Sequence, residues 1–475
     1  MPSNQLFSIK MRQVRRGTLL VLFSIATISC AKKQLPQPDA NLFLQSNSTP
    51  ADPYSYVPSR NQVKANSKAD ADQIALLMYR RLVGVSVPVG SQIIQDMSAA
   101  ILADNAGRAA ALAVNEPNFL NITVRYMGIK MSYQDEKPNH PSNDFTATLV
   151  GAVRDDVSAY ELLTGNFSYR VDPARLPAGV AVRSDVYTDI LRTNNHYIDL
   201  DARGFNATWL ARKDGMEIVA GNNVIDLLPD KDASPLLTSR GFTAAHAIAG
   251  TNRRMYQYTF LQFMCVGMTE FSDTSVSDEF VGRDVDRYDP KFQTRCKGCH
   301  GQMDGMRGAF ANIDFFDNGT VGFLKHSSKL LAQPLLLNQT ENEFNFKTFR
   351  GPNGVTLYPG VAEKMNHNEQ VYTPGRIIDS DAWTNLAVGN GNSNYFGWRG
   401  ALKGNGIKSF ARMIAGSERF GKCMAAKVFT EVCKRKPNDG DQALINYAGK
   451  KFEDSGYKFK GLFQTIVPQA ECLGK

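Results

Sequence analysis

Cys296, Cys299 and His300 form a short group whose residue types and spacing specify a chemistry. The segment reads Cys-Lys-Gly-Cys-His, which is the attachment pattern of c-type haem. Each thiol can add across a vinyl group of the porphyrin, and the adjacent imidazole then binds the iron as an axial ligand. Because the ring is rigid, all three residues are needed at this spacing. The pattern predicts one covalent haem c, with His300 as the proximal iron ligand.

Other uses of a CxxC pair remain open at this point. A zinc site needs two further ligands, and the chain has no second CxxC and no HxxxH. A redox dithiol is expected beside a strand that enters a βαβ unit, which residues 292–295 and 301–302 do not resemble. A plain disulfide and a stray metal site are the remaining alternatives.

The first thirty residues indicate export. Four basic residues and no acidic one begin the chain: Lys10, Arg12, Arg15 and Arg16. The apolar run over 17–29 is shorter than the ~20 residues that span a bilayer, so it is typical of a signal peptide. It ends at Thr27-Ile28-Ser29-Cys30, which resembles the lipobox of bacterial lipoproteins. We expect a lipidated Cys30, with simple secretion as the alternative. Ala31 in place of Asp implies an outer-membrane anchor that faces the periplasm.

Export also changes the net charge of the mature chain and the roles expected of its cysteines. The net charge of +8 falls to +4 when the four basic residues of the signal are removed. A mildly basic chain does not suggest a nucleic-acid partner. Four cysteines remain after lipid and haem are assigned: Cys265, Cys423, Cys433 and Cys472. An even number in an oxidising compartment predicts two disulfides, whose pairing stays open among three possibilities.

Apolar periodicity predicts a mainly α fold. Helical spacing covers 72–82, 91–101, 108–114, 117–131, 145–163 and the chain from 407 onward. Residues 258–265 predict a buried helix that leads toward the haem motif. Residues 165–230 indicate loops and short strands, with His196 expected at the surface. The fold class is therefore a multi-helical body with an embedded mono-haem cytochrome c-like segment and long loop-rich insertions.

The composition changes along the chain predict its organisation. The expected parts are a signal peptide at 1–29, a flexible tether at 30–70, a mainly helical domain at 71–235, a c-haem domain at 236–330, a loop-rich extension at 331–420 and a helical domain at 421–475.

Four stretches together resemble the planctomycete-type cytochrome c family, exported multidomain proteins with one CxxCH. They are Glu161-Leu162-Leu163-Thr164 with Phe167 and Tyr169; Arg240-Gly241 through Arg253 to Cys265; the CxxCH with Met303-Asp304, Ala309-Phe310, Asn312 and Asp314; and Asp441 with Phe452, Ser455-Gly456-Tyr457, Phe459 and Leu462. Gly305 and Ala311 depart from the family pattern. The resemblance implies the haem segment and a helical C-terminal domain, and no single activity.

The second axial ligand decides between functions. A Met or His there makes an electron carrier, and an open face permits binding of small ligands. The candidates are Met306, Met365, Met413, His326 and His367, of which Met365 has the separation expected of a distal methionine. We expect a periplasmic electron carrier with a redox partner protein. The alternatives are a haem oxidase or peroxidase and a structural envelope lipoprotein. The sequence shows no other catalytic set.

Overall fold

The computed structural model describes residues 61–221, 224–247, 252–281, 289–326, 330–331, 349–350, 356–359, 364–366, 376–378, 381–389 and 391–474. Between 327 and 380 it describes strand backbones without side chains. The described residues belong to one compact unit. The predicted signal peptide and Cys30 lie outside the described residues.

The described chain begins with three helices, α2 (Lys68–Val83), α3 (Gln92–Leu102) and α4 (Ala106–Ala113). Ser67 accepts a hydrogen bond from the Asp70 amide at the start of α2, and Gly84 ends it with a φ of 79°. The apolar faces of these helices are buried, so the predicted helices over 72–82, 91–101 and 108–114 are confirmed.

Of the next two predicted helices, one is confirmed and one is wrong. A π-helical turn, η2 (Phe119–Val124), continues directly into α5 (Arg125–Ser132), which confirms a helix over 117–131. The single helix predicted over 145–163 is wrong, because α6 (Asp144–Arg154) and α7 (Ala159–Thr164) are separate. Asp156 has a φ of 54°, in the left-handed region that ends a helix. Ser158 then caps α7 by accepting from the Tyr160 amide.

Residues 165–230 contain short strands and turns, as predicted. They form β1 (Phe167–Val171), η3 (Pro173–Arg175), η4 (Val186–Leu191), α8 (Asn195–Ala202), η5 (Ala207–Trp209), β2 (Leu210–Asp214), β3 (Glu217–Gly221), β4 (Val224–Leu227) and η6 (Asp230–Asp232). The surface position predicted for His196 is wrong, since this side chain is fully buried. Its Nε2 accepts from the Val171 amide at 3.3 Å and its Nδ1 contacts the Arg183 carbonyl, so it satisfies backbone groups inside the fold.

The central segment carries the CxxCH. It comprises α9 (Arg240–His246), α10 (Arg253–Phe263), η7 (Phe292–Cys296), α11 (Lys297–Met306), η8 (Arg307–Phe310), β5 (Ile313–Asp317) and β6 (Gly322–His326). The predicted buried helix before the motif is confirmed as α10. Short elements follow: β7 (Leu330–Leu331), β8 (Phe349–Arg350), β9 (Thr356–Pro359), β10 (Lys364–Asn366), β11 (Arg376–Ile378), β12 (Ala382–Thr384), α12 (Asn392–Phe396) and β13 (Lys403–Asn405).

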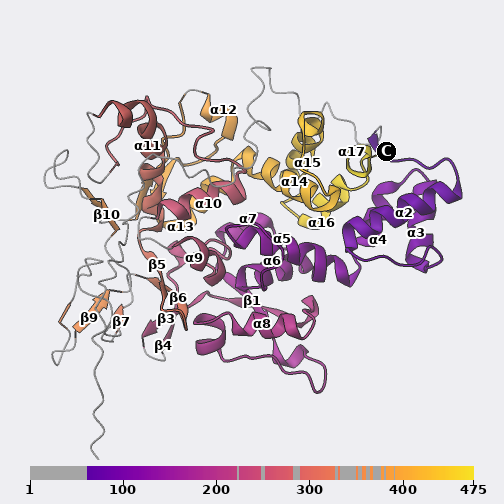
Figure 1. Ribbon diagram of the computed structural model, residues 1–475, viewed down its shortest axis with the longest axis horizontal. Helices are drawn as coiled ribbons and strands as arrows, with labels where there is room; N and C mark the ends of the chain where they lie inside the picture. The colour runs from indigo at the N-terminus through magenta and orange to yellow at the C-terminus, as the bar shows by residue number, and fades with distance from the viewer. Residues whose placement is uncertain are drawn as a thin grey trace, which may run out of the picture. The chain divides into compact units, whose positions relative to one another are not determined.

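The C-terminal part is helical, as predicted. Its helices are α13 (Gly406–Ala415), α14 (Glu418–Cys433), η10 (Asp439–Asp441), α15 (Gln442–Asp454), α16 (Phe459–Ile466) and α17 (Ala470–Leu473). The start of the described chain meets this end, since the Val63 amide donates to the Pro468 carbonyl at 2.9 Å. Figure 1 shows α17 beside the indigo N-terminal helices, with α14 and α15 next to it.

Helices dominate the described chain, and its strands form small antiparallel sheets of two or three strands. The mainly α fold is therefore confirmed. The predicted pair of disulfides is also present, as Cys265–Cys423 between the end of α10 and α14, and Cys433–Cys472 between α14 and α17. A search of the described helices finds none that is both long and apolar enough to cross a membrane.

Candidate functional site

The CxxCH occupies the junction of two helical segments. Cys296 is the last residue of η7, and Cys299 and His300 lie in the first turn of α11. Because an α-helix has 3.6 residues per turn, residues three and four apart lie one above the other. The two sulfurs and the imidazole therefore occupy neighbouring positions at the start of α11.

One face of α11 packs closely against other segments of the chain. Gly298, Gly301, Gly305 and Gly308 recur at intervals of three and four, and each backbone lies against another segment. A Cβ on Gly298 would lie 2.2 Å from the Ser272 hydroxyl, and one on Gly308 would lie 2.0 Å from the Ala382 carbonyl. A Cβ at Gly305 or Gly308 would collide with a backbone carbonyl, and one at Gly298 or Gly301 would first meet a neighbouring side chain. The glycines thus fix which side of α11 packs most closely, and Cys299 and His300 project from other positions around the helix, where both are partly exposed.

A buried ionic cluster stands beside His300. Its Nδ1 lies 4.0 Å from the Oδ2 of Asp304, one turn further along α11. Asp304 is fully buried and accepts two hydrogen bonds from Arg253, at 2.7 Å and 2.6 Å. Arg307 lies 3.2 Å from the same carboxylate and is 1% exposed. Burial raises the pKa of Asp304, but the positive charges of Arg307 and Arg253 outweigh that effect and hold the pKa below its usual 3.8.

This arrangement suits a histidine that binds a metal through its outer nitrogen. At 4.0 Å the carboxylate is too far from Nδ1 for a hydrogen bond, but its negative charge favours a proton on that nitrogen, which leaves the Nε2 lone pair for a ligand. The His300 side chain is 22% exposed, so part of the ring reaches the surface of the described structure. The donor set, an oriented imidazole next to two cysteines one turn apart, fits c-type haem in residue type and order.

The two cysteines are in different states. Cys299 is a free thiol whose Sγ donates to the Met268 carbonyl at 3.4 Å. Burial raises its pKa more than the Ser272 hydroxyl lowers it, so the thiol is neutral at pH 7. Cys296 is disulfide-bonded in this structure. One sulfur cannot hold a disulfide and a thioether together, so haem attachment requires the Cys296 disulfide to be reduced first.

Helix α10 supplies groups that the sequence interpretation missed. Tyr256 is fully buried, and its hydroxyl has no hydrogen-bond partner among the described residues. Burial, followed by nearby Cys299 and Asp304, raises the pKa of this hydroxyl. Arg253 and Tyr256 share a helix with Phe260 and Phe263, both buried. Polar groups within so apolar a helix require partners, which was the signal available in the sequence.

The candidate distal ligands lie in different surroundings in the structure. Met365 lies in β10 and pairs with Ile377 in backbone register, but its side chain, like all of His367, lies outside the described residues. Met306 is buried in the core. The Met413 sulfur accepts from Asn385 at 3.3 Å, and the Nε2 of His326 lies 2.8 Å from Asp232. Met413 and His326 would have to give up these bonds to bind iron.

Two searches give negative results. Within the described ranges, no group of three or more His, Cys, Asp or Glu side chains is arranged to hold a metal ion. Comparisons with protein-family models, curated proteins and solved structures found no match to this chain.

Proposed function

We propose that this chain carries one haem c, attached through Cys296 and Cys299 with His300 as the proximal ligand, and that it transfers single electrons in the periplasm. The observation that supports the proposal most is the buried Asp304 at the Nδ1 of His300, held by two arginines. Metal-binding histidines commonly have a carboxylate beside the ring nitrogen that faces away from the metal.

Each residue has a stated task. Bound haem supplies a one-electron couple at its iron. Cys296 and Cys299 anchor the ring, and His300 presents Nε2. The negative charge of Asp304, 4.0 Å from Nδ1, favours the proton on that nitrogen, and Arg253 and Arg307 keep Asp304 ionised. Two arginines against one carboxylate leave a positive excess, which favours the reduced state of a redox group at His300.

Absorption spectroscopy of the protein, produced by a host that attaches c-type haem, tests the proposal. We expect a Soret band that survives acid–acetone extraction of the denatured protein and is absent from the Cys296→Ser/Cys299→Ser variant. A chain without covalent haem under these conditions would contradict it. A low-spin spectrum with a methionine-to-iron band supports an electron carrier, and a high-spin spectrum that shifts with cyanide points instead to an enzyme with an open distal face.

The envelope location is part of the same proposal. A lipid on Cys30 would anchor the chain to the outer membrane, where a periplasmic redox protein would be its partner. Fractionation tests this point, because Cys30→Ala should move the protein from the membrane fraction to the soluble periplasm. A Cys30→Ala protein that stays in the membrane would exclude the lipid anchor and leave the haem proposal intact.

A further inference from the structure

A pocket of about 320 Å³ lies between α5, the C-terminal end of α10 and α14. We propose that it is a second binding site, independent of the haem proposal, for a small monoanionic amphiphile: an apolar chain that ends in a carboxylate. No role in the CxxCH site uses these residues.

The floor of the pocket is apolar and preformed. Met127, Met131 and Ala426 are each at most 5% exposed, and Leu261 lies beside them. Methionine side chains adapt to irregular apolar ligands. The Cys265–Cys423 disulfide ties the end of α10 to α14 at the pocket wall, so the two helices cannot separate. The volume holds about ten heavy atoms, at the ~30 Å³ that a water-sized group fills.

Some charged side chains in the pocket lining are only partly compensated by a side chain of opposite charge. Lys130 and Glu431 form an ion pair at 2.7 Å, so they are already satisfied. Lys427 donates to Gln262 at 2.8 Å, but its distance to Glu136 is 4.0 Å. The Lys427 side chain is 18% exposed, and burial lowers its pKa more than Glu136 raises it. A ligand carboxylate is the partner that such an under-compensated ammonium favours.

Glu270 provides the second polar group. Its Oε1 accepts from the Gly267 amide at 2.7 Å, and its Oε2 is buried without a hydrogen-bond partner in the described part of the chain. Burial raises the pKa of Glu270, although the Gly267 amide and Arg419 lower it. A protonated Glu270 donates to a carboxylate instead of repelling it. Burial therefore favours the protonated form of Glu270, and the exposed Lys436 adds a cation at the rim of the pocket.

Backbone geometry also marks this pocket. Glu136 and Cys265 have φ values of 52° and 51°, in the left-handed region that residues other than Gly, Asn and Asp rarely adopt. Such strain costs about 1–3 kcal/mol per residue and is concentrated at binding sites. Two strained residues in the lining of one pocket therefore support a ligand site there.

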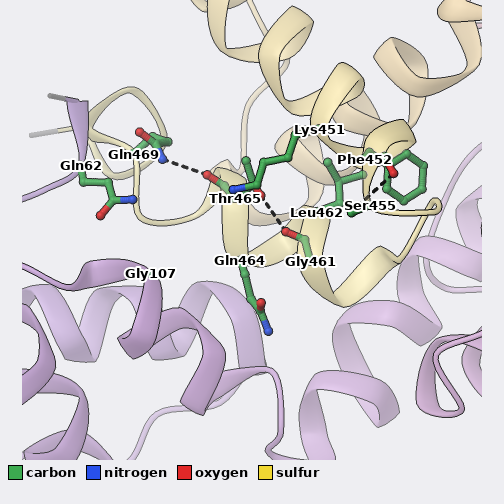
Figure 2. A pocket seen from close by; sticks show the side chains of 10 residues that line it. All are labelled: Gln62, Gly107, Lys451, Phe452, Ser455, Gly461, Leu462, Gln464, Thr465 and Gln469. Carbon is green, nitrogen blue, oxygen red and sulfur yellow. Dashed lines mark hydrogen bonds between the residues drawn. The ribbon is translucent and has the colours of Figure 1, made fainter. Parts of the chain in front are cut away.

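A smaller hollow of about 240 Å³ lacks these features. It lies between the start of the described chain and α15–α16, and Figure 2 shows hydrogen bonds that join Gln469 to Thr465, Thr465 to Gly461 and Ser455 to Phe452. Gln469 donates to the Thr465 carbonyl at 2.9 Å, and Thr465 donates to Gly461 at 2.8 Å. The charged lining residue Lys451 is exposed, and the described lining of the hollow has no buried charged side chain comparable to Lys427 or Glu270, so it suggests no ligand.

Calorimetric titration of the full-length protein with octanoate, 1-octanol and octylamine tests the proposal, because these probes share a chain length and differ in charge. We expect octanoate to bind about tenfold or more tightly than octanol, since a hydrogen bond to a charged group contributes about 1.5–3 kcal/mol. Octylamine should bind more weakly still. No binding of octanoate, or equal binding of all three, would overturn the proposal.

Variants locate the site. Lys427→Met should weaken octanoate binding about tenfold or more and leave octanol binding unchanged. Lys427→Arg, which keeps the charge, and Lys64→Met, on the exposed surface, should bind like the parent protein. Ala426→Phe fills the pocket and should abolish binding of both probes. If octanoate binds equally to Lys427→Met and Lys427→Arg, or still binds Ala426→Phe, the pocket is not the site. Haem content is unchanged in either outcome, so this result is separate from the proposed function.

Discussion

Replacing Asp304 with Asn is the most informative single change in the described structure. The carboxylate is fully buried and is contacted by Arg253 through two hydrogen bonds and by Arg307 at 3.2 Å. The variant keeps the shape but leaves two buried guanidinium groups without a counter-charge. Removing one partner of a buried ion pair costs about 3–5 kcal/mol. Most domains have a total free energy of unfolding of about 5–15 kcal/mol, so this is a large loss.

Urea unfolding followed by tryptophan fluorescence measures the effect. With a denaturant slope of about 3 kcal/mol per M, the loss lowers the midpoint by about 1–2 M. Asp454→Asn is the matched control, because the Lys450–Asp454 pair lies on the surface with Asp454 45% exposed. Such a pair contributes about 0–1 kcal/mol, so the control should unfold close to the parent protein.

The pH dependence gives a second readout of the same interaction. The pKa of Asp304 in the folded protein is below 3.8, so its contribution to stability is complete above that pH. It is lost as the pH falls below 3.8 toward the folded-state pKa. The stability gap between the parent protein and Asp304→Asn should therefore be constant at neutral pH and shrink in acid. If Asp304→Asn costs no more than Asp454→Asn, or if the gap widens in acid, the assigned role of Asp304 is wrong.

Further predictions concern packing and cross-links. Gly308→Ala should destabilise the fold by about 1–3 kcal/mol, because a Cβ there would lie 2.0 Å from a backbone carbonyl. Gly461→Ala should stabilise α16 by about 0.5–1 kcal/mol, because a Cβ there has nothing within 4 Å. Thermal unfolding should therefore show a lower melting temperature for Gly308→Ala and a higher one for Gly461→Ala. The Cys433→Ser/Cys472→Ser variant should lose up to about 4 kcal/mol, from the chain entropy of the 39-residue separation that the disulfide closes. Urea titration of this variant measures that loss, and a parent-like midpoint would contradict it.

The helices were predictable where local signals agreed with the fold. Helix α2 has a capping serine, apolar residues at helical spacing and a closing glycine, and its bounds contain the predicted range. The break between α6 and α7 was not predictable from apolar periodicity alone, because Val153 and Val157 keep the helical spacing across the charged residues between them. Asp156 adopts a left-handed conformation that ends α6. This conformation depends on the turn that the chain makes there, and the spacing of apolar residues does not predict it.

Long-range contacts account for the other errors and omissions. His196, in α8, lies 25 residues from the Val171 amide that it bonds, and the sequence around it gives no sign of such a partner. The Arg253–Asp304 pair joins residues 51 apart on different helices. The disulfide pairing was open for the same reason, since Cys265 and Cys423 are 158 residues apart. The CxxCH was recognisable because its residues are adjacent in sequence, whereas the groups that orient His300 come from the fold.

Mass spectrometry of the peptide that spans residues 296–307 tests the central claim most directly. The protein would be produced with c-type haem attachment active and digested without reduction. The account predicts that this peptide carries one haem on Cys296 and Cys299, and that Cys299→Ser reduces the adduct to a single thioether. A peptide whose Cys296 remains in a disulfide, with Cys299 as an unmodified thiol and no haem, would contradict the account.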